Sequence, residues 1–217
     1  MPDQEPHEPT ADEASAPTRK RPKPGERRLQ ILQTLAAMLE QPGAERVTTA
    51  GLAAKIGVSE AALYRHFASK AQMFEGLIDF VDQSTMGLIR QVTDRDPPGS
   101  QQAGRIVALL FQFAEKNPGM SRVMIGDALV LEHERLQERI NLLFDKIEAQ
   151  LRQTLKTSDS TTPTADAQVT ASVLVAFMQG RLQRFARTGF KRLPSEHLQA
   201  ALARVLEAKV GGALALK

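Results

Sequence analysis

Side chains suited to binding a nucleic acid gather in one short stretch of this chain. Tyr64, Arg65, His66 and Lys70 all carry N–H or O–H donors, and Tyr64 is the only tyrosine present. Donors of this kind bind phosphate oxygens, which positions a protein on DNA without reading the base sequence. The stretch therefore predicts a surface that contacts the DNA backbone.

Two short helices joined by a turn must position these donors. Thr48 or Thr49 can cap the first helix, because a side-chain oxygen accepts an N–H that the helix leaves unpaired. Gly57 suits the left-handed position that ends this helix, and Ser59 can cap the second one. Two short helices with a glycine-containing turn predict a helix-turn-helix, whose second helix enters the major groove of DNA.

The predicted DNA contacts come from the helix caps and from the outward face of the second helix. The first residues of that helix are small, so its backbone can lie deep in a groove about 12 Å wide. The predicted DNA-binding residues are Thr48, Thr49, Ser59, Glu60, Ala61, Ala62, Tyr64, Arg65, His66 and Lys70. The alternative is a helical hairpin inside an ordinary bundle, which has the same apolar spacing.

The chain shows no residue pattern typical of an enzyme or a metal site. Its four histidines are scattered, and Glu132-His133-Glu134 would point apart as consecutive residues of a helix. Cysteine is absent, which excludes disulfides, thiolate metal sites and a cysteine nucleophile. No glycine-rich phosphate loop is present. We therefore predict a protein that is not an enzyme and that uses no metal and no cofactor.

Length and charge agree with a cytoplasmic DNA-binding protein. The chain has 217 residues and a net charge of only +3, so the placement of charge matters more than its sum. No apolar run reaches the roughly 18 residues of a membrane span. The first residues are acidic and rich in proline, unlike a signal peptide.

Residues 1–24 are predicted to be a disordered tail. They contain six prolines and almost no large apolar side chains, so they cannot bury enough surface to offset the entropy of ordering. The basic half of the tail, Arg19 to Lys23, directly precedes the first helix. It is either an arm that reaches DNA or a solvated linker, and both interpretations stay open.

Everything after the tail is predicted to be helical. Apolar spacing predicts further helices over about 25–40, 69–94, 102–116, 121–130, 131–156, 166–188 and 195–210. Ser69 and Gln72 form a capping-box pattern at the start of the second of these. The alternation typical of strands is missing. The fold prediction is all-α, with a helix-turn-helix domain over 25–70 and a helical domain over 71–217.

The segment from Leu63 to Phe67, followed by Ser69-Lys70, resembles the recognition region of TetR-type regulators. Four further segments resemble a branch of that family, the nucleoid occlusion factors: Asn117-Pro118-Gly119, Asp127-Ala128-Leu129, 136–141 and 147–153. The likeness covers roughly residues 25–190. It implies a homodimer that pairs through its last two long helices. Phe177, Gly180 and Phe185 are the interface residues we expect, with ordinary core packing as the alternative.

The resemblance also implies a second partner. A nucleoid occlusion factor bound to DNA would bind the tubulin-like protein FtsZ and inhibit assembly of its ring over the nucleoid. The implied partner-binding residues are Phe80, Leu109, Lys116 and Asn117. Leu88 and Gln112 depart from the family pattern, which has a basic and a small residue there.

The other function that the resemblance leaves open is a ligand-responsive repressor. Such a protein needs an apolar pocket among the helices of its C-terminal domain, and sequence alone does not distinguish a pocket from a packed core. Because the likeness to nucleoid occlusion factors extends beyond the DNA-binding region, we expect no small-molecule ligand.

Overall fold

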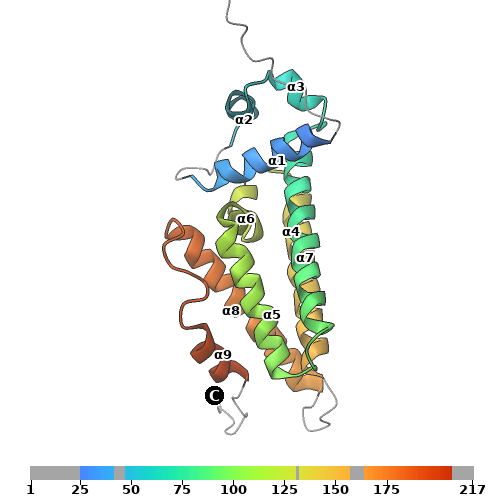
Figure 1. Cartoon of the computed structure of the whole chain (residues 1–217), viewed down its shortest axis with the longest axis vertical. Helices are drawn as coiled ribbons and strands as arrows, with labels where there is room; N and C mark the ends of the chain where they lie inside the picture. The colour runs from blue at the N-terminus through green and yellow to red at the C-terminus, as the bar shows by residue number, and fades with distance from the viewer. Residues whose placement is uncertain (1–24, 42–46, 131, 157–163, 207–217) are drawn as a thin grey trace, which may run out of the picture.

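The computed structural model describes residues 25–41, 47–130, 132–156 and 164–206, which form helices and no strand. The helices are α1 (Glu26–Leu39), α2 (Thr49–Ile56), α3 (Glu60–Tyr64), α4 (Lys70–Thr93), α5 (Ser100–Lys116), α6 (Pro118–Met124), the short 3₁₀ helix η2 (Asp127–Leu129), α7 (Glu134–Leu155), α8 (Thr164–Arg187) and α9 (Leu198–Leu206). Figure 1 shows α1, α2 and α3 as a head at one end of an elongated body formed by the other helices. The all-α prediction is confirmed, and the predicted tail lies outside the described residues.

Local caps define the two helices of the helix-turn-helix. The Thr48 hydroxyl oxygen accepts the Gly51 N–H at 3.1 Å, and the Ser59 hydroxyl oxygen accepts the Ala62 N–H at 3.3 Å. Gly57 ends α2 with a φ of 76°, a conformation that costs glycine little because it has no Cβ. The predicted caps are confirmed, with Thr48 rather than Thr49 as the cap of α2 and with Gly57 and Ser59 in their expected roles.

One apolar core holds the head together and continues into the body. In the head it consists of side chains from all three helices and the turn after α3: Ile31, Leu35, Leu39, Leu52, Leu63 and Phe67. In the body, α4 contributes the next buried set, which includes Met73, Phe74, Leu77, Ile78 and Val81. Burial of this much apolar surface is the main force that stabilises the fold.

The head rests on α6 as well as on the start of α4. Gly119 lies against the backbone of α1, and a Cβ at this position would stand 2.2 Å from the Ala36 carbonyl oxygen. Only a residue without a side chain allows the two helices to approach this closely. The position of the head relative to the body therefore depends on Gly119.

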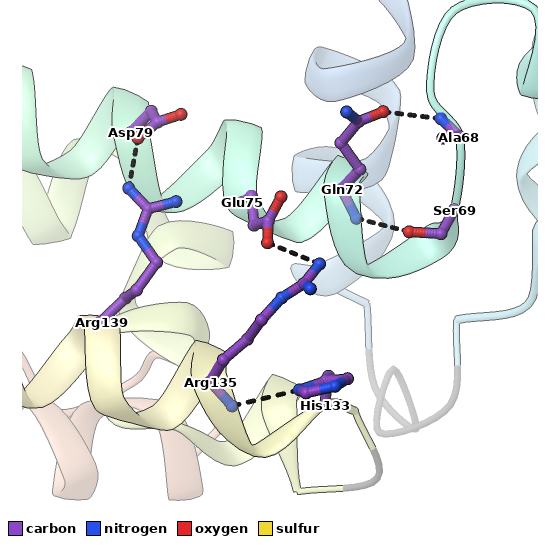
Figure 2. Close-up of polar contacts among 8 residues, drawn as sticks. All are labelled: Ala68, Ser69, Gln72, Glu75, Asp79, His133, Arg135 and Arg139. Carbon is purple, nitrogen blue, oxygen red and sulfur yellow. Dashed lines mark hydrogen bonds and ion pairs between the residues drawn. The ribbon is translucent and has the colours of Figure 1, made fainter.

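Polar contacts join the start of α4 and the facing surface of α7 (Figure 2). The Ser69 hydroxyl oxygen accepts the Gln72 N–H at 3.1 Å, while Gln72 Oε1 accepts the Ala68 N–H at 2.6 Å. The predicted capping box is thus present, with its return bond displaced by one residue. Along the same helix, ion pairs link α4 to α7: Glu75 with Arg135 at 2.7 Å, Asp79 with Arg139, and Asp82 with Lys146 at 2.7 Å.

Several predicted helix boundaries were wrong by a few residues. The helix predicted from residue 121 begins at Pro118, so only Asn117 separates α5 from α6. Proline is suited to this first helical position, which requires no N–H. The helix predicted from residue 131 begins at Glu134, with His133 as its N-cap. The last helix begins at Leu198 instead of residue 195.

The apolar residues of α8 lie on two faces of the helix. Val169 and Val173 are 62% and 46% exposed. The residues that α8 buries lie on another face of the helix: Ala171, Leu174, Val175, Met178, Leu182 and Phe185. The buried face of α8 packs against α5, α6 and α7, so Val169 and Val173 stay uncovered in the single chain.

Candidate nucleic-acid interface

The outward side of α3 carries the predicted base-reading and phosphate-binding side chains. Leu63 and Phe67 turn inward and are buried, so Tyr64, Arg65 and His66 are left on the surface, with Tyr64 45% exposed. Glu60 and Ala61 are exposed as well, whereas Ala62 is half-buried. Figure 1 shows α2 and α3 at the end of the head that is farther from the body.

A hydrogen bond joins the first residue of α2 to the first residue of α3. The Thr49 hydroxyl donates to Glu60 Oε2 at 2.6 Å. A hydroxyl has a single proton, so Thr49 cannot donate to a phosphate while this bond exists. Thr48 uses its oxygen only as an acceptor in its cap, which leaves its own proton available for a phosphate. Of the two threonines, Thr48 is therefore the better phosphate donor.

Arg28 is a positioning residue that the predicted contact set did not include. Its guanidinium donates to the His66 carbonyl oxygen at 2.8 Å and lies 4.0 Å from the centre of the Phe67 ring. Both contacts fix the end of α3 against α1. A sequence signal existed, because Arg27 and Arg28 occupy the first turn of α1, where positive charge is unfavourable for the helix dipole.

Lys70 has a partner inside the chain. Its ammonium group pairs with the Glu132 carboxylate and lies 5.7 Å from the centre of the Phe74 ring. Lys70 is the first residue of α4 and is partly exposed. Its expected contact with phosphate stays a prediction.

Comparison with known proteins agrees with this geometry. Residues 31–77 match the model of the bacterial regulatory proteins of the tetR family, and residues 101–208 match the SlmA-like model of the tetracyclin repressor-like C-terminal domain. The nucleoid occlusion factor SlmA of Idiomarina loihiensis is 48% identical over 177 residues, which is 80% of this chain and 90% of that protein. SlmA of Vibrio vulnificus is 46% identical over 181 residues, covering 82% of this chain and 92% of its own. The chain belongs to the SlmA family of TetR-type regulators.

Solved structures show the same fold at greater evolutionary distance. A transcriptional regulator from Rhodococcus superposes with a TM-score of 0.67 over 83% of this chain and 94% of its own, at 19% identity. This likeness confirms the TetR-like architecture predicted from the sequence.

In the part of the chain that the structure describes, no helix is long and apolar enough to cross a membrane.

The residues expected to bind a protein partner lie on α4, on α5 and just after α5. Phe80 is 46% exposed although its ring centre is only 6.2 Å from that of Phe113. Leu109 is half-buried and Lys116 is exposed, while Asn117 donates from its side chain to the Phe113 carbonyl oxygen at 2.7 Å. Of these four residues, Leu109 lines a groove of about 380 Å³, together with Val92, Arg95, Arg105 and Gln112 among others.

The expected dimer-interface residues have different environments. Gly180 is exposed, and Phe177 is half-buried with its ring centre 5.9 Å from that of Phe111. Phe185 is 1% exposed and packs edge-on against Phe190 within the same chain. The structure thus places the Phe185 side chain in the core, whereas Val169 and Val173 of the same helix are available to a second copy.

Proposed function

We propose that this chain is a nucleoid occlusion factor of the SlmA type. As a dimer it binds specific chromosomal sites, and in the DNA-bound state it binds FtsZ and inhibits ring assembly over the nucleoid. The observation that carries the proposal is the capped helix α3, with Tyr64 at its end and Arg65 and His66 directly after it, all three exposed, in a chain that belongs to the SlmA family.

Pairing of two copies is required for the proposed DNA binding. A single helix-turn-helix binds weakly, and two-fold dimers read half-sites about 34–36 Å apart. The uncovered stripe of α8 supports pairing through this helix: Val169 and Val173 are apolar and exposed, and Gly180 meets no atom within 4 Å of its would-be Cβ. We place the interface on these three residues and Phe177, together with α9.

We place the FtsZ-binding surface on Phe80, Leu109, Lys116 and Asn117. An exposed aromatic ring such as that of Phe80 is typical of an interface anchor, because aromatic side chains bury much apolar area for little entropy. Lys116 is exposed at the end of α5, so it can attract an acidic segment of the partner. Leu88 and Gln112, which depart from the family pattern, border this surface and would alter the detail of the contact.

A chromosome-wide map of bound sites by immunoprecipitation from growing cells is the first test. We expect many sites spread along the chromosome and few near the replication terminus. The DNA assignment is checked with Tyr64→Ala, which should weaken binding by about 1–3 kcal/mol if the ring contacts a base, while Tyr64→Phe removes only the hydroxyl. A few sites at promoters would instead identify a local, ligand-responsive repressor and overturn the proposal.

The FtsZ assignment needs its own assay. The amount of FtsZ polymer that sediments should decrease when the protein is added together with its DNA site. Without that DNA the decrease should be much smaller. Lys116→Glu should abolish the effect without changing DNA binding. Lys191→Glu, a charge reversal at another exposed lysine, is the matched control and should behave as wild type. Equal activity of the two variants would remove Lys116 from the partner surface.

A further inference from the structure

The Lys70–Glu132 ion pair links the DNA-binding head to a distant part of the chain. Lys70 begins α4, directly after the recognition region, whereas Glu132 precedes His133, the N-cap of α7. The Glu132 side chain is only 12% exposed. A carboxylate buried to this extent depends on its partner, because removal of the opposite charge leaves it poorly solvated.

The polarity of this pair is reversed relative to its neighbours. Along the contact between α4 and α7, the other three pairs place the acid on α4 and the base on α7: Glu75–Arg135, Asp79–Arg139 and Asp82–Lys146. Only the pair nearest the head, among these four, has its positive charge on the α4 side. Figure 2 shows two of the other three, together with the cap of α4 and the start of α7.

The reversed polarity gives Lys70 two anionic partners that compete. If Lys70 contacts a DNA phosphate, as the proposed function holds, the phosphate arrives beside the Glu132 carboxylate. An ammonium group shared between two anions attracts each of them less, and the two anions repel one another. DNA binding must therefore weaken the Lys70–Glu132 pair, whether the lysine leaves Glu132 or bridges both groups.

We propose that the Lys70–Glu132 pair is an autoinhibitory contact that DNA phosphate opens. In the DNA-free state Glu132 holds Lys70 and lowers the affinity for DNA. In the DNA-bound state Lys70 turns to the phosphate, and Glu132, now without its partner, moves toward water. The bond from the Gln137 side chain to the Gly126 carbonyl oxygen, at 3.1 Å, joins α7 to the residue before η2.

The inference rests on the proposed DNA-binding mode and adds a route by which DNA alters the body of the protein. Binding linkage is reciprocal, so whatever stabilises the Lys70–Glu132 pair weakens DNA binding by the same factor by which DNA weakens the pair. The coupling crosses from the head to Glu132, which lies just before α7, through the Lys70–Glu132 pair.

The DNA affinity of the Glu132→Gln variant tests whether the Lys70–Glu132 pair inhibits DNA binding, because inhibition predicts tighter binding by the variant. Fluorescence anisotropy with a DNA duplex selected by the wild-type protein should show that E132Q binds more tightly, by roughly 5-fold or more at low salt. Asp82→Asn, which breaks a pair of the same kind far from the head, is the matched control and should bind as wild type. In a Lys70→Met background, Glu132→Gln should leave the affinity unchanged within about twofold.

A second measurement does not depend on how the variants fold. Hydrogen exchange of the wild-type protein should become faster over residues 126–130, 132 and 133 when the duplex is added. Unchanged or weaker binding by E132Q, or unchanged exchange in the wild type, would overturn the inference while DNA binding itself stands. Failure of the wild type to bind any selected duplex would overturn the proposed function instead.

Discussion

Substitution of Gly119 by alanine probes how closely the body approaches the head. The new Cβ would lie 2.2 Å from the Ala36 carbonyl oxygen and 3.1 Å from its carbonyl carbon. Both atoms belong to the backbone of α1, so no side-chain rotation relieves the clash, and α1 must move by about 1 Å in a tightly packed region. Overpacking of this kind costs about 1–3 kcal/mol, and we expect the upper half of that range.

Urea and thermal unfolding at a fixed protein concentration measure the effect. For a chain of this size a loss of 1 kcal/mol lowers the melting temperature by about 2–4 °C, so Gly119→Ala should lower it by roughly 4–12 °C. Gly87→Ala is the matched control: Gly87 lies inside α4, and its Cβ would meet no atom within 4 Å. Alanine is the better helix former, so this control should gain about 0.5–1 kcal/mol.

The same substitution should also weaken DNA binding below the unfolding temperature. The shift of α1 reaches α3 because Arg28 connects the two through the His66 carbonyl oxygen and the Phe67 ring. If Gly119→Ala unfolds at or above the wild-type midpoint, the close approach of α6 to α1 is wrong. If it is destabilised but binds DNA as wild type, the route through Arg28 is wrong.

Three further substitutions test separate parts of the structure. Val173→Asp places a charge on the uncovered stripe of α8 and should give monomers in sedimentation velocity with unchanged helical content; dimers would move the interface elsewhere. Phe185→Ala should cost about 3–5 kcal/mol in urea unfolding, because it leaves a cavity in the core, and a loss of dimers without such a cost would return Phe185 to the interface. Ser69→Ala should cost about 1 kcal/mol by removal of the α4 cap, and no loss would show that the Gln72 N–H does not need the Ser69 hydroxyl as its acceptor.

The helix caps and the turn of the helix-turn-helix could be predicted from the sequence. The caps at Thr48 and Ser59 bond to N–H groups only three residues away, and the left-handed turn at Gly57 depends on that residue alone. Such interactions do not depend on the rest of the fold, so residue types and spacing identify them. The recognition helix, its outward side chains and the all-α class followed from these signals.

Contacts between residues far apart in the sequence could not be predicted in this way. The bond between Thr49 and Glu60 spans eleven positions, and that between Arg28 and His66 spans 38. Each changes the role of a residue whose type suggested a simpler one: Thr49 donates to a carboxylate, and Arg28 orients α3. Nothing in the spacing of these residues encodes the angle at which their helices cross.

The sequence by itself determined which segments are helical, which residues we predict to contact DNA and which family the residues resemble, since those inferences depend on local spacing. Only the tertiary structure decided which face of α8 is buried and which side chain pairs with Lys70. Val173 and Leu174 are neighbours of similar character, yet one is exposed and the other buried. Lys70 and Glu132 are 62 positions apart. Both outcomes follow from how the helices pack against one another, and that packing minimises the exposed apolar surface of the whole chain rather than of any one segment.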